Sequence, residues 1–255
     1  MVARCGRGPL LVTSDGARTW HPARVGSRGF AAAVADRGGQ VYALAVKCGQ
    51  DETSCPVTAL YRSAAGSRTW KRMPAAGLAQ VNESGGPSLA AWGRSVWIMV
   101  GNGEIGSPLL LWSADGGRSF RQAAVTAVGC WLAATSPAVA WLSCSGGMML
   151  TFDRWVGGRL ARLPVTGAGT GNTFLDPVSD TAVYFGTAVG DAAGLYLSRD
   201  AGARFARIAR LPAALGSGTA AHMVFVTIRT GLAWADGGPL LRTTDSGATW
   251  ATVRL

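Results

Sequence analysis

The sequence predicts an all-β protein in which one four-stranded antiparallel unit is repeated along the whole chain. Two observations support this prediction. First, a short phrase recurs in which a hydroxyl residue is followed two positions later by Asp, then by Gly or Ala, and finally by Trp or Phe. Second, the 255-residue chain holds 36 glycines and few long apolar windows at helical spacing, which favours many short strands and turns.

The copies of this phrase are regularly spaced. Complete copies occupy residues 13–20, 113–120, 198–205 and 243–250. A further copy at 63–70 has Ala65 in place of the Asp, and another near 151–155 keeps little besides Asp153. The starts at 13, 63, 113, 151, 198 and 243 give intervals of 50, 50, 38, 47 and 45 residues. Repeats of this length are typical of propeller blades or of a solenoid.

Each copy lies between two short apolar runs, so it predicts a tight turn that joins two strands. The Asp side chain can accept hydrogen bonds from amides of the turn, and Gly permits the positive φ that a tight turn needs. The closing aromatic residue begins the next strand and should pack into the core beside the neighbouring unit. We therefore expect structural rather than catalytic roles for Asp15, Asp115, Asp200, Asp245, Trp20, Trp70, Phe120, Phe205 and Trp250.

The phrase resembles the Asp-box of bacterial neuraminidase (BNR) repeats, and the resemblance covers essentially the whole chain. It implies a β-propeller similar to those of sialidases, photosystem assembly factors and sortilins, with a six-bladed-type architecture of four-stranded antiparallel blades in a single domain, residues 1–255. In that family the box lies on the hairpin between the third and fourth strands of a blade, on the face opposite the ligand. We expect the first blade to be incomplete, because the chain opens almost at its third strand.

Aromatic residues recur at a matching place in the expected second strands, which predicts core packing. These residues are Tyr42, Trp97, Trp141, Tyr184 and Trp234. Tyr61 and Tyr196 recur in the expected third strands, two residues before the box. All four tyrosines of the chain therefore occupy repeat positions, which leaves none available as a catalytic nucleophile.

The charge is strongly positive, at +10 from 24 basic and 14 acidic residues, and only Lys47 and Lys71 are lysines. An excess of Arg with much Ala and Gly is typical of GC-rich bacterial genomes such as those of actinobacteria. The arginines are scattered, without a basic run interleaved with aromatic residues, so we do not expect a nucleic-acid partner. No apolar stretch reaches the roughly 18 to 20 residues that a transmembrane segment needs.

The cysteines predict two disulfides, Cys48–Cys55 and Cys130–Cys144, each of which would close a short loop. The alternative is a set of buried free thiols. Disulfides would place the protein outside the cytoplasm, either secreted or anchored to the envelope. Cys5 aligns with Cys144, so we expect its partner, and an export signal, in a segment upstream of the given sequence. Otherwise Cys5 is free and the ring closes between partial blades.

Loops on the face opposite the boxes hold the candidate ligand-binding residues. The three glutamates of the chain and Asp51 fall in successive loops of two neighbouring blades, with two asparagines beside them. This acidic group could bind a cation, an amine or a polar sugar, or the exposed loops could simply tolerate carboxylates. The candidates are Asp51, Glu52, Asn82, Glu83, Asn102 and Glu104. No cluster of His, Cys and Asp has metal-ligand spacing, so we expect neither a metal nor a cofactor.

Catalysis is the alternative to binding. The resemblance to sialidases implies a Tyr nucleophile, a Glu, a general-acid Asp, three arginines and an Arg-Ile-Pro motif in the first blade. Here Arg207 and Ile208 are followed by Ala209 in the fifth unit, so that motif is absent. The resemblance thus favours an exported, monomeric, non-catalytic propeller that binds a protein or a glycan. The alternative is an exo-sialidase-like glycoside hydrolase, for which Glu52 and Glu104 are the carboxylates to test.

Overall fold

The computed structural model describes residues 2–3, 11–12, 19, 21–22, 30–36, 39–46, 57–65, 67, 69–76, 78, 88–100, 109–125, 128–146, 149–168, 173–187, 193–212, 215, 221–235 and 237–253. These residues belong to two compact units, Met1–Ala140 and Trp141–Leu255. The part of the chain that is described contains β-strands and turns but no α-helix. The all-β prediction is therefore confirmed.

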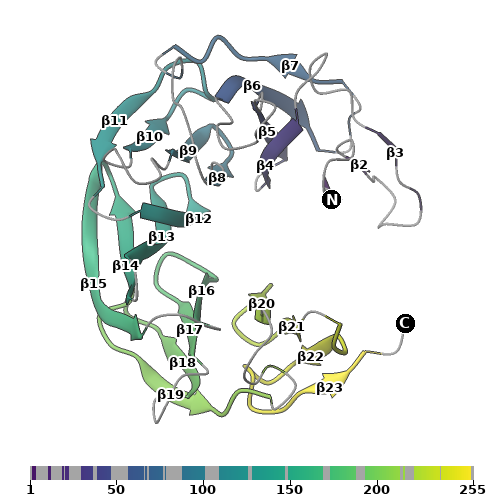
Figure 1. Ribbon diagram of the computed structural model, residues 1–255, viewed down its shortest axis with the longest axis vertical. Helices are drawn as coiled ribbons and strands as arrows, with labels where there is room; N and C mark the ends of the chain where they lie inside the picture. The colour runs from purple at the N-terminus through teal and green to yellow at the C-terminus, as the bar shows by residue number, and fades with distance from the viewer. Residues whose placement is uncertain are drawn as a thin grey trace. The chain divides into compact units, whose positions relative to one another are not determined.

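Short strands follow one another throughout the first unit. They are β1 (Val2–Ala3), β2 (Leu11–Val12), β3 (His21–Pro22), β4 (Phe30–Asp36), β5 (Gln40–Val46), β6 (Val57–Ala64), β7 (Lys71–Arg72), β8 (Ser88–Trp92), β9 (Ser95–Val100), β10 (Leu109–Ser113), β11 (Arg121–Ala124) and β12 (Val128–Ser136). They form the sheets β1–β3, β4–β7 and β8–β11, and β12 opens the sheet β12–β15 (Figure 1).

The same pattern continues in the second unit. Its strands are β13 (Val139–Gly146), which starts just before the unit boundary, β14 (Met149–Val156), β15 (Arg159–Ala168), β16 (Thr173–Pro177), β17 (Val183–Thr187), β18 (Gly194–Ser198), β19 (Ala206–Ala209), β20 (Ala221–Phe225), β21 (Gly231–Ala235), β22 (Leu241–Thr243) and β23 (Ala251–Thr252). Strands β16–β19 and β20–β23 form two further four-stranded sheets.

Every sheet is a meander, because strands that follow each other in sequence are also hydrogen-bonded neighbours. All the strand pairs whose registers are defined are antiparallel, as the repeat predicted. The first sheet differs from the expectation in one respect. Strand β1 pairs with β2, with Val2 opposite Val12, so one strand precedes the first box strand where none was expected.

The copy of the phrase near residues 151–155 is not a turn. Strand β14 continues through Asp153 to Val156, with a shift of its register against β15 between Thr151 and Asp153. The chain turns at Gly157 and Gly158, which have φ values of +55° and +96°. Asp153 is buried, and its carboxylate accepts a hydrogen bond from Arg162 Nε at 2.6 Å across the β14–β15 pair. This copy keeps the hydroxyl of Thr151 but has Trp155 in place of the box Gly, and the turn lies at the later Gly-Gly pair.

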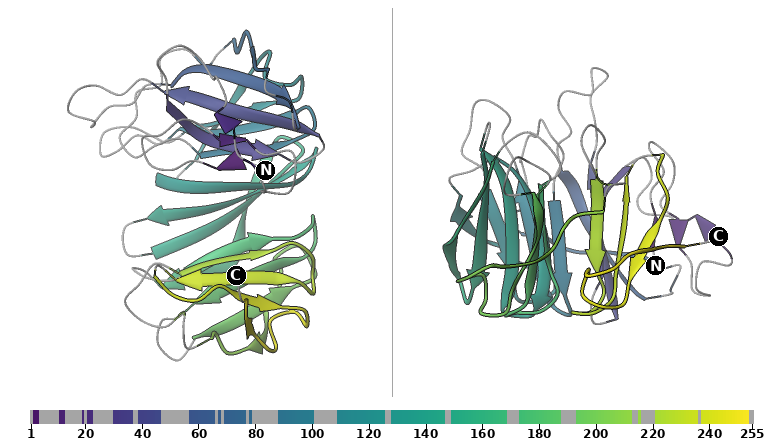
Figure 2. Two further views of the ribbon diagram at one scale, coloured as in Figure 1. Left: turned by 90° about the vertical axis from the view of Figure 1, so that its right-hand side faces the viewer. Right: turned by 90° about the horizontal axis from the view of Figure 1, so that it is seen from below.

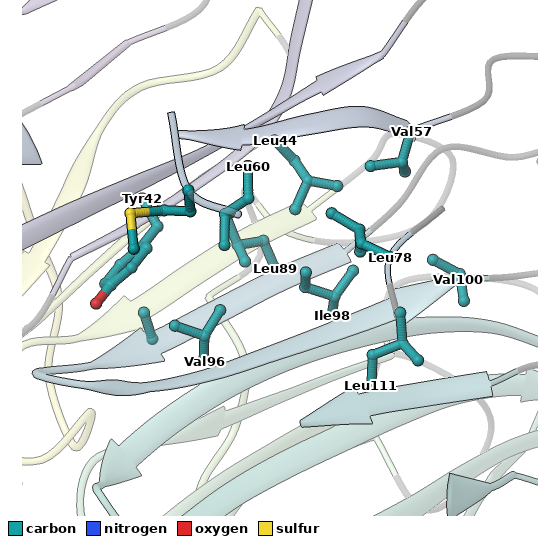
Figure 3. Close-up of a cluster of buried hydrophobic side chains, with 12 residues drawn as sticks. Tyr42, Leu44, Val57, Leu60, Leu78, Leu89, Val96, Ile98, Val100 and Leu111 are labelled. Carbon is teal, nitrogen blue, oxygen red and sulfur yellow. The ribbon is translucent and has the colours of Figure 1, made fainter. Parts of the chain in front are cut away.

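The largest described core of the first unit lies between the sheets β4–β7 and β8–β11. Alternate residues of β5 and β9 point into it, and Phe120, the closing aromatic of a box, packs against its edge. Figure 3 shows the side chains of the two sheets pointing toward one another. The cluster comprises Tyr42, Leu44, Val57, Leu60, Met73, Leu78, Leu89, Ala91, Val96, Ile98, Val100 and Leu111.

The second unit has an equivalent core between the sheets β16–β19 and β20–β23, which lie side by side (Figure 2). The Tyr184 ring stacks on Phe225, with centroids 3.5 Å apart and an interplanar angle of 6°. Trp250, another closing aromatic of a box, packs against the same cluster and meets Phe225 edge-on. Box aromatics therefore take part in the packing between consecutive sheets in both units.

A side-chain hydrogen bond to the next sheet recurs along the chain. In each case the acceptor is a backbone carbonyl in the turn between the first and second strands of the following sheet. The donor–acceptor pairs are Tyr42 to Gly93, Ser95 to Pro137, Arg154 to Asp180, and Tyr184 to Ile228. We call these hydrogen bonds the inter-sheet latches. Because a turn carbonyl has no strand partner, each latch satisfies a polar group that burial would otherwise penalise.

The second-strand aromatics are part of this arrangement. Tyr42, Trp97, Trp141 and Tyr184 are fully buried, as the repeat predicted. Trp97 has no phenolic hydroxyl, its indole N–H lacks a partner, and Ser95 supplies the latch of that sheet instead. The prediction is wrong for Trp234, which is only half-buried and stacks on exposed His222 with ring centroids 5.2 Å apart.

Removing one latch should measurably weaken the second unit. Tyr184→Phe keeps the ring that stacks on Phe225 but leaves the Ile228 carbonyl without its donor, so we expect a loss of about 1 to 2 kcal/mol in the free energy of unfolding. Urea titration followed by tryptophan fluorescence would measure it. Tyr61→Phe is the control, because Tyr61 is half-buried and makes no latch. Equal losses in the two variants would contradict the latch.

Candidate functional site

The described box turns share one hydrogen-bonding pattern, which starts from the hydroxyl residue that ends the third strand. Ser113 Oγ donates to Asp115 Oδ1 at 2.7 Å and accepts from the Gly117 amide at 2.9 Å. Ser198 and Thr243 repeat both contacts in their own boxes, with matching distances within 0.1 Å. The hydroxyl therefore links the carboxylate to the backbone of the turn, which is a local Asx- and Ser/Thr-type motif.

The Asp carboxylate also accepts hydrogen bonds from the residues at the end of the turn. Asp115 Oδ1 accepts from the amides of Arg118 and Ser119 at 2.9 and 3.0 Å, and Oδ2 accepts from Ser119 Oγ at 2.6 Å. Asp245 makes the equivalent pair of contacts with the Thr249 amide and hydroxyl. Asp200 accepts from the Arg204 amide at 3.0 Å. These amides lie in the turn and are satisfied by the carboxylate, whereas the Arg118 carbonyl and the Phe120 amide pair with Ala76.

These contacts lower the pKa values of the box carboxyls. The hydrogen bond from the Thr249 hydroxyl, followed by those from its amide and from Thr243, lowers the pKa of Asp245 to about 2. The hydrogen bond from Ser198 and then the Arg204 amide likewise lower the pKa of Asp200. Burial alone would raise the pKa of Asp115, but its hydrogen bonds from Ser119 and Ser113 outweigh burial and hold it well below the usual range. The box carboxylates are therefore anions at neutral pH.

Two consecutive left-handed residues shape each of the three complete box turns that the structure describes. Gly116, Ala201 and Ser246 have φ between 62° and 78°, and the glycine that follows each of them has φ between 81° and 88°. The amide of the first left-handed residue donates to a carbonyl in the turn between the first two strands, for example Gly116 to Arg94 at 2.8 Å. Box turns and first-to-second-strand turns therefore lie at the same end of each sheet.

The copy without Asp uses a hydroxyl in place of the carboxylate. Ser67 Oγ accepts from the Thr69 amide at 3.1 Å and lies 2.9 Å from Thr69 Oγ1. In the complete copies the equivalent amide binds the Asp carboxylate. Ser63, without a carboxylate partner, donates instead to the Thr69 carbonyl at 2.8 Å.

We expect Ser67→Ala to lower the free energy of unfolding by about 1 kcal/mol, since the Thr69 amide loses its acceptor. Adding Ala65→Asp, which restores the carboxylate of the complete copies, should recover most of this loss. Urea unfolding of the parent chain, the two single variants and the double variant would give the coupling free energy between positions 65 and 67. Independent, additive effects at the two positions would contradict the idea that one acceptor replaces the other.

The six candidate ligand-binding residues, Asp51, Glu52, Asn82, Glu83, Asn102 and Glu104, lie outside the described residues, as do Asp15 and Trp20. Among the residues with a described position, no group of three or more His, Cys, Asp or Glu side chains could hold a metal ion. No helix in the described ranges is long and apolar enough to cross a membrane.

The cysteine prediction is supported where the structure describes it. Cys130 on β12 and Cys144 on β13 are both disulfide-bonded, and they lie on adjacent strands of one sheet. Both side chains are buried. Cys5, Cys48 and Cys55 lie outside the described residues.

Solved structures with the same arrangement of four-stranded meanders are β-propellers. YCF48 bound to D1 peptide aligns over 96% of this chain and 74% of its own, with a TM-score of 0.59 and 17% identity. This chain has a β-propeller fold. The GH74 xyloglucanase from Xanthomonas campestris aligns over 92% of this chain but 39% of its own, with a TM-score of 0.58 and 20% identity.

A third structure, the SapL1 lectin in complex with alpha methyl fucoside, aligns over 96% of this chain and 90% of its own, with a TM-score of 0.55 and 11% identity. No protein-family model matches the sequence, and no curated protein matches it. Identities this low establish the fold of the blades and nothing finer.

Proposed function

We propose that the chain is an exported, non-catalytic β-propeller that binds a protein or a glycan. The observation behind this proposal is that the conspicuous carboxylates and the buried tyrosines both serve the framework. Asp115, Asp200 and Asp245 each accept hydrogen bonds from amides of their own turn. Tyr42 and Tyr184 are fully buried and donate to turn carbonyls of the following sheet.

These roles leave both sets of residues poorly suited to glycoside hydrolysis. A general acid must hold a proton near neutral pH, whereas hydrogen bonding keeps the box carboxyls ionised. A Tyr nucleophile must reach the substrate and lose its proton, whereas burial raises the pKa values of Tyr42 and Tyr184. A hydrolase in this chain would have to use other residues, and Glu52 and Glu104 are the candidates.

Two of the similar solved structures hold a bound peptide or sugar, which supports the proposal of a binding propeller. The chain spans 74% of a YCF48 structure that contains a peptide and 90% of a lectin structure that contains a fucoside, but only 39% of the xyloglucanase.

The proposal includes six blades, with the first incomplete, in one monomeric domain. Five four-stranded sheets and one three-stranded sheet among the described strands fit that number. The disulfide at Cys130 and Cys144 supports an extracytoplasmic location, because disulfides persist mainly in oxidising compartments. The proposal also keeps the Cys48–Cys55 disulfide and the acidic ligand candidates on the face opposite the boxes.

Turnover and binding assays on the purified protein test this function. Turnover would be measured with a fluorogenic sialoside and a set of fluorogenic glycosides, and binding with an immobilised glycan array and a displayed peptide library. We expect saturable binding to a peptide or glycan without turnover. Turnover that disappears in Glu52→Gln or Glu104→Gln would overturn the proposal in favour of the hydrolase. The absence of both binding and turnover would overturn it as well.

A further inference from the structure

We propose that Trp131 is the anchoring residue through which the propeller binds an acidic peptide segment, by packing against an apolar side chain of that segment. This inference rests on the proposed binding function and specifies its partner. It concerns Trp131 and the residues of β8 and β12 that flank it, all of which lie in the first unit.

The first supporting observation is the exposure of Trp131. Its side chain is 77% exposed, which is the highest value among the exposed large apolar residues of the described chain. It projects from β12, an edge strand of its sheet, whereas Cys130, Ala134 and Thr135 of the same strand are buried. Tryptophan is enriched among residues that dominate binding free energy at protein interfaces, because it buries a large, rigid surface with few rotatable bonds.

The second observation is that the backbone on both sides of Trp131 is fixed. Cys130 is disulfide-bonded and buried. On the other side, the Leu132 amide donates to Ser88 Oγ on the neighbouring strand β8 at 2.9 Å. A peptide bound to Trp131 would therefore not have to order the strand that presents it, which lowers the entropic cost of binding.

The surroundings of the indole select the chemistry of the partner. Side chains alternate along a strand, so among the described residues of β12 Ala133 and Thr135 share the face of the indole, whereas Cys130 and Ala134 are buried on the other face. Ala133 is apolar and Thr135 is buried, so the described residues of this face offer no exposed side-chain hydrogen bond to sugar hydroxyls. An apolar side chain of a peptide suits this strand better than a glycan does, since glycan recognition needs placed polar groups.

The positive charge of the protein favours a negatively charged partner. The exposed charged side chains described in the first unit are all basic: Lys71, Arg72, Arg94, Arg118 and Arg121. The whole chain carries a net charge of +10. Electrostatic complementarity speeds association with acidic partners and suppresses basic ones, so the segment should be rich in Asp and Glu around its apolar anchor.

The test starts from peptides selected on the full chain from a displayed library of random twelve-residue sequences. Each selected peptide would be synthesised, and its affinity measured by calorimetry for the unmodified protein and for Trp131→Ala, Trp131→Phe and Val226→Ala. Val226 is the matched control, because it is an exposed apolar residue, at 65%, of the other unit. Thermal unfolding of each variant would verify that it is folded, and an exposed indole should contribute little to that stability.

We expect the selected peptides to be acidic with one apolar or aromatic residue. Trp131→Ala should weaken their binding at least about thirtyfold, Trp131→Phe should retain most of it, and Val226→Ala should leave it unchanged. Selected peptides that bind Trp131→Ala as tightly as the unmodified chain would overturn this inference while the binding function stands. Binding to the glycan array but to no peptide would do the same. Failure of peptides and glycans alike would overturn the proposed function itself.

Discussion

Gly117→Ala is expected to lower the free energy of unfolding by about 3 kcal/mol, an effect out of proportion to one added methyl group. Two costs combine. Gly117 has φ of +81°, a left-handed conformation that costs an L-residue about 1 to 2 kcal/mol. A Cβ atom there would also lie 2.3 Å from Leu60 Cδ2 of the preceding sheet. Leu60 is fully buried, so it cannot swing away, and overpacking adds about 1 to 3 kcal/mol.

Gly93→Ala separates the two costs. Gly93 also has positive φ, at +57°, but a Cβ atom at that position would meet no atom within 4 Å. Gly93→Ala should therefore lower the free energy of unfolding only by the conformational cost of positive φ, about 1 to 2 kcal/mol. Urea unfolding of both variants and of the parent chain gives the comparison. If the two substitutions cost the same, Gly117 would be needed for its φ alone, and the contact that a Cβ atom would make with the preceding sheet would contribute nothing.

Replacing both Cys130 and Cys144 with Ala is expected to cost about 3 kcal/mol under oxidising conditions. The disulfide closes a loop of about 15 residues, which in the chain-entropy account restricts the unfolded state by this amount. Both positions are buried, so Ala, which is smaller and apolar, adds only a minor packing loss.

Dithiothreitol provides the control for this prediction. It should destabilise the parent chain by a similar amount, and any effect left in the double variant would come from the other cysteines. A double variant as stable as the parent chain would contradict a structural role for this disulfide.

The sequence predicted the fold because its evidence is local and repeated. A hydroxyl, an Asp and a Gly at fixed spacing satisfy one another within eight residues, as the contacts of Ser113, Asp115 and Gly117 show. Such a turn does not depend on the rest of the chain, so each copy marks a hairpin. The intervals between copies then give the size of the repeated sheet, and the recurring second-strand aromatics give its core.

Features that depend on contacts between different sheets could not be predicted in this way. The box signal near Asp153 was wrong because Thr151 and Asp153 without the Gly that follows them in the complete copies do not specify a turn. Trp234 has the position of a core aromatic, but its exposure depends on what covers the sheet. Trp131 follows no repeat, so nothing in the sequence separated it from the other tryptophans. The Ser95 and Arg154 latches likewise come from positions without a shared motif.

The central claim is that the repeated Asp carboxylates, as anions, accept hydrogen bonds within the turns and take no part in catalysis. It is tested most directly by the pH dependence of stability in the triple variant Asp115→Asn, Asp200→Asn, Asp245→Asn. A carboxyl whose pKa is lower in the folded state stabilises the protein fully above its unfolded pKa of about 4. That stabilisation disappears as the pH falls through the folded value, which is about 2 for Asp245.

We therefore expect the parent chain to exceed the triple variant in free energy of unfolding at pH 7, as measured by urea titration. Below about pH 4 the difference should shrink steadily toward pH 2, because the parent loses a stabilisation that the variant never had. The remaining acidic residues are the same in both proteins and affect both curves equally. Parallel curves, with equal stability at pH 7 and equal slopes in acid, would contradict the framework role of the box carboxylates.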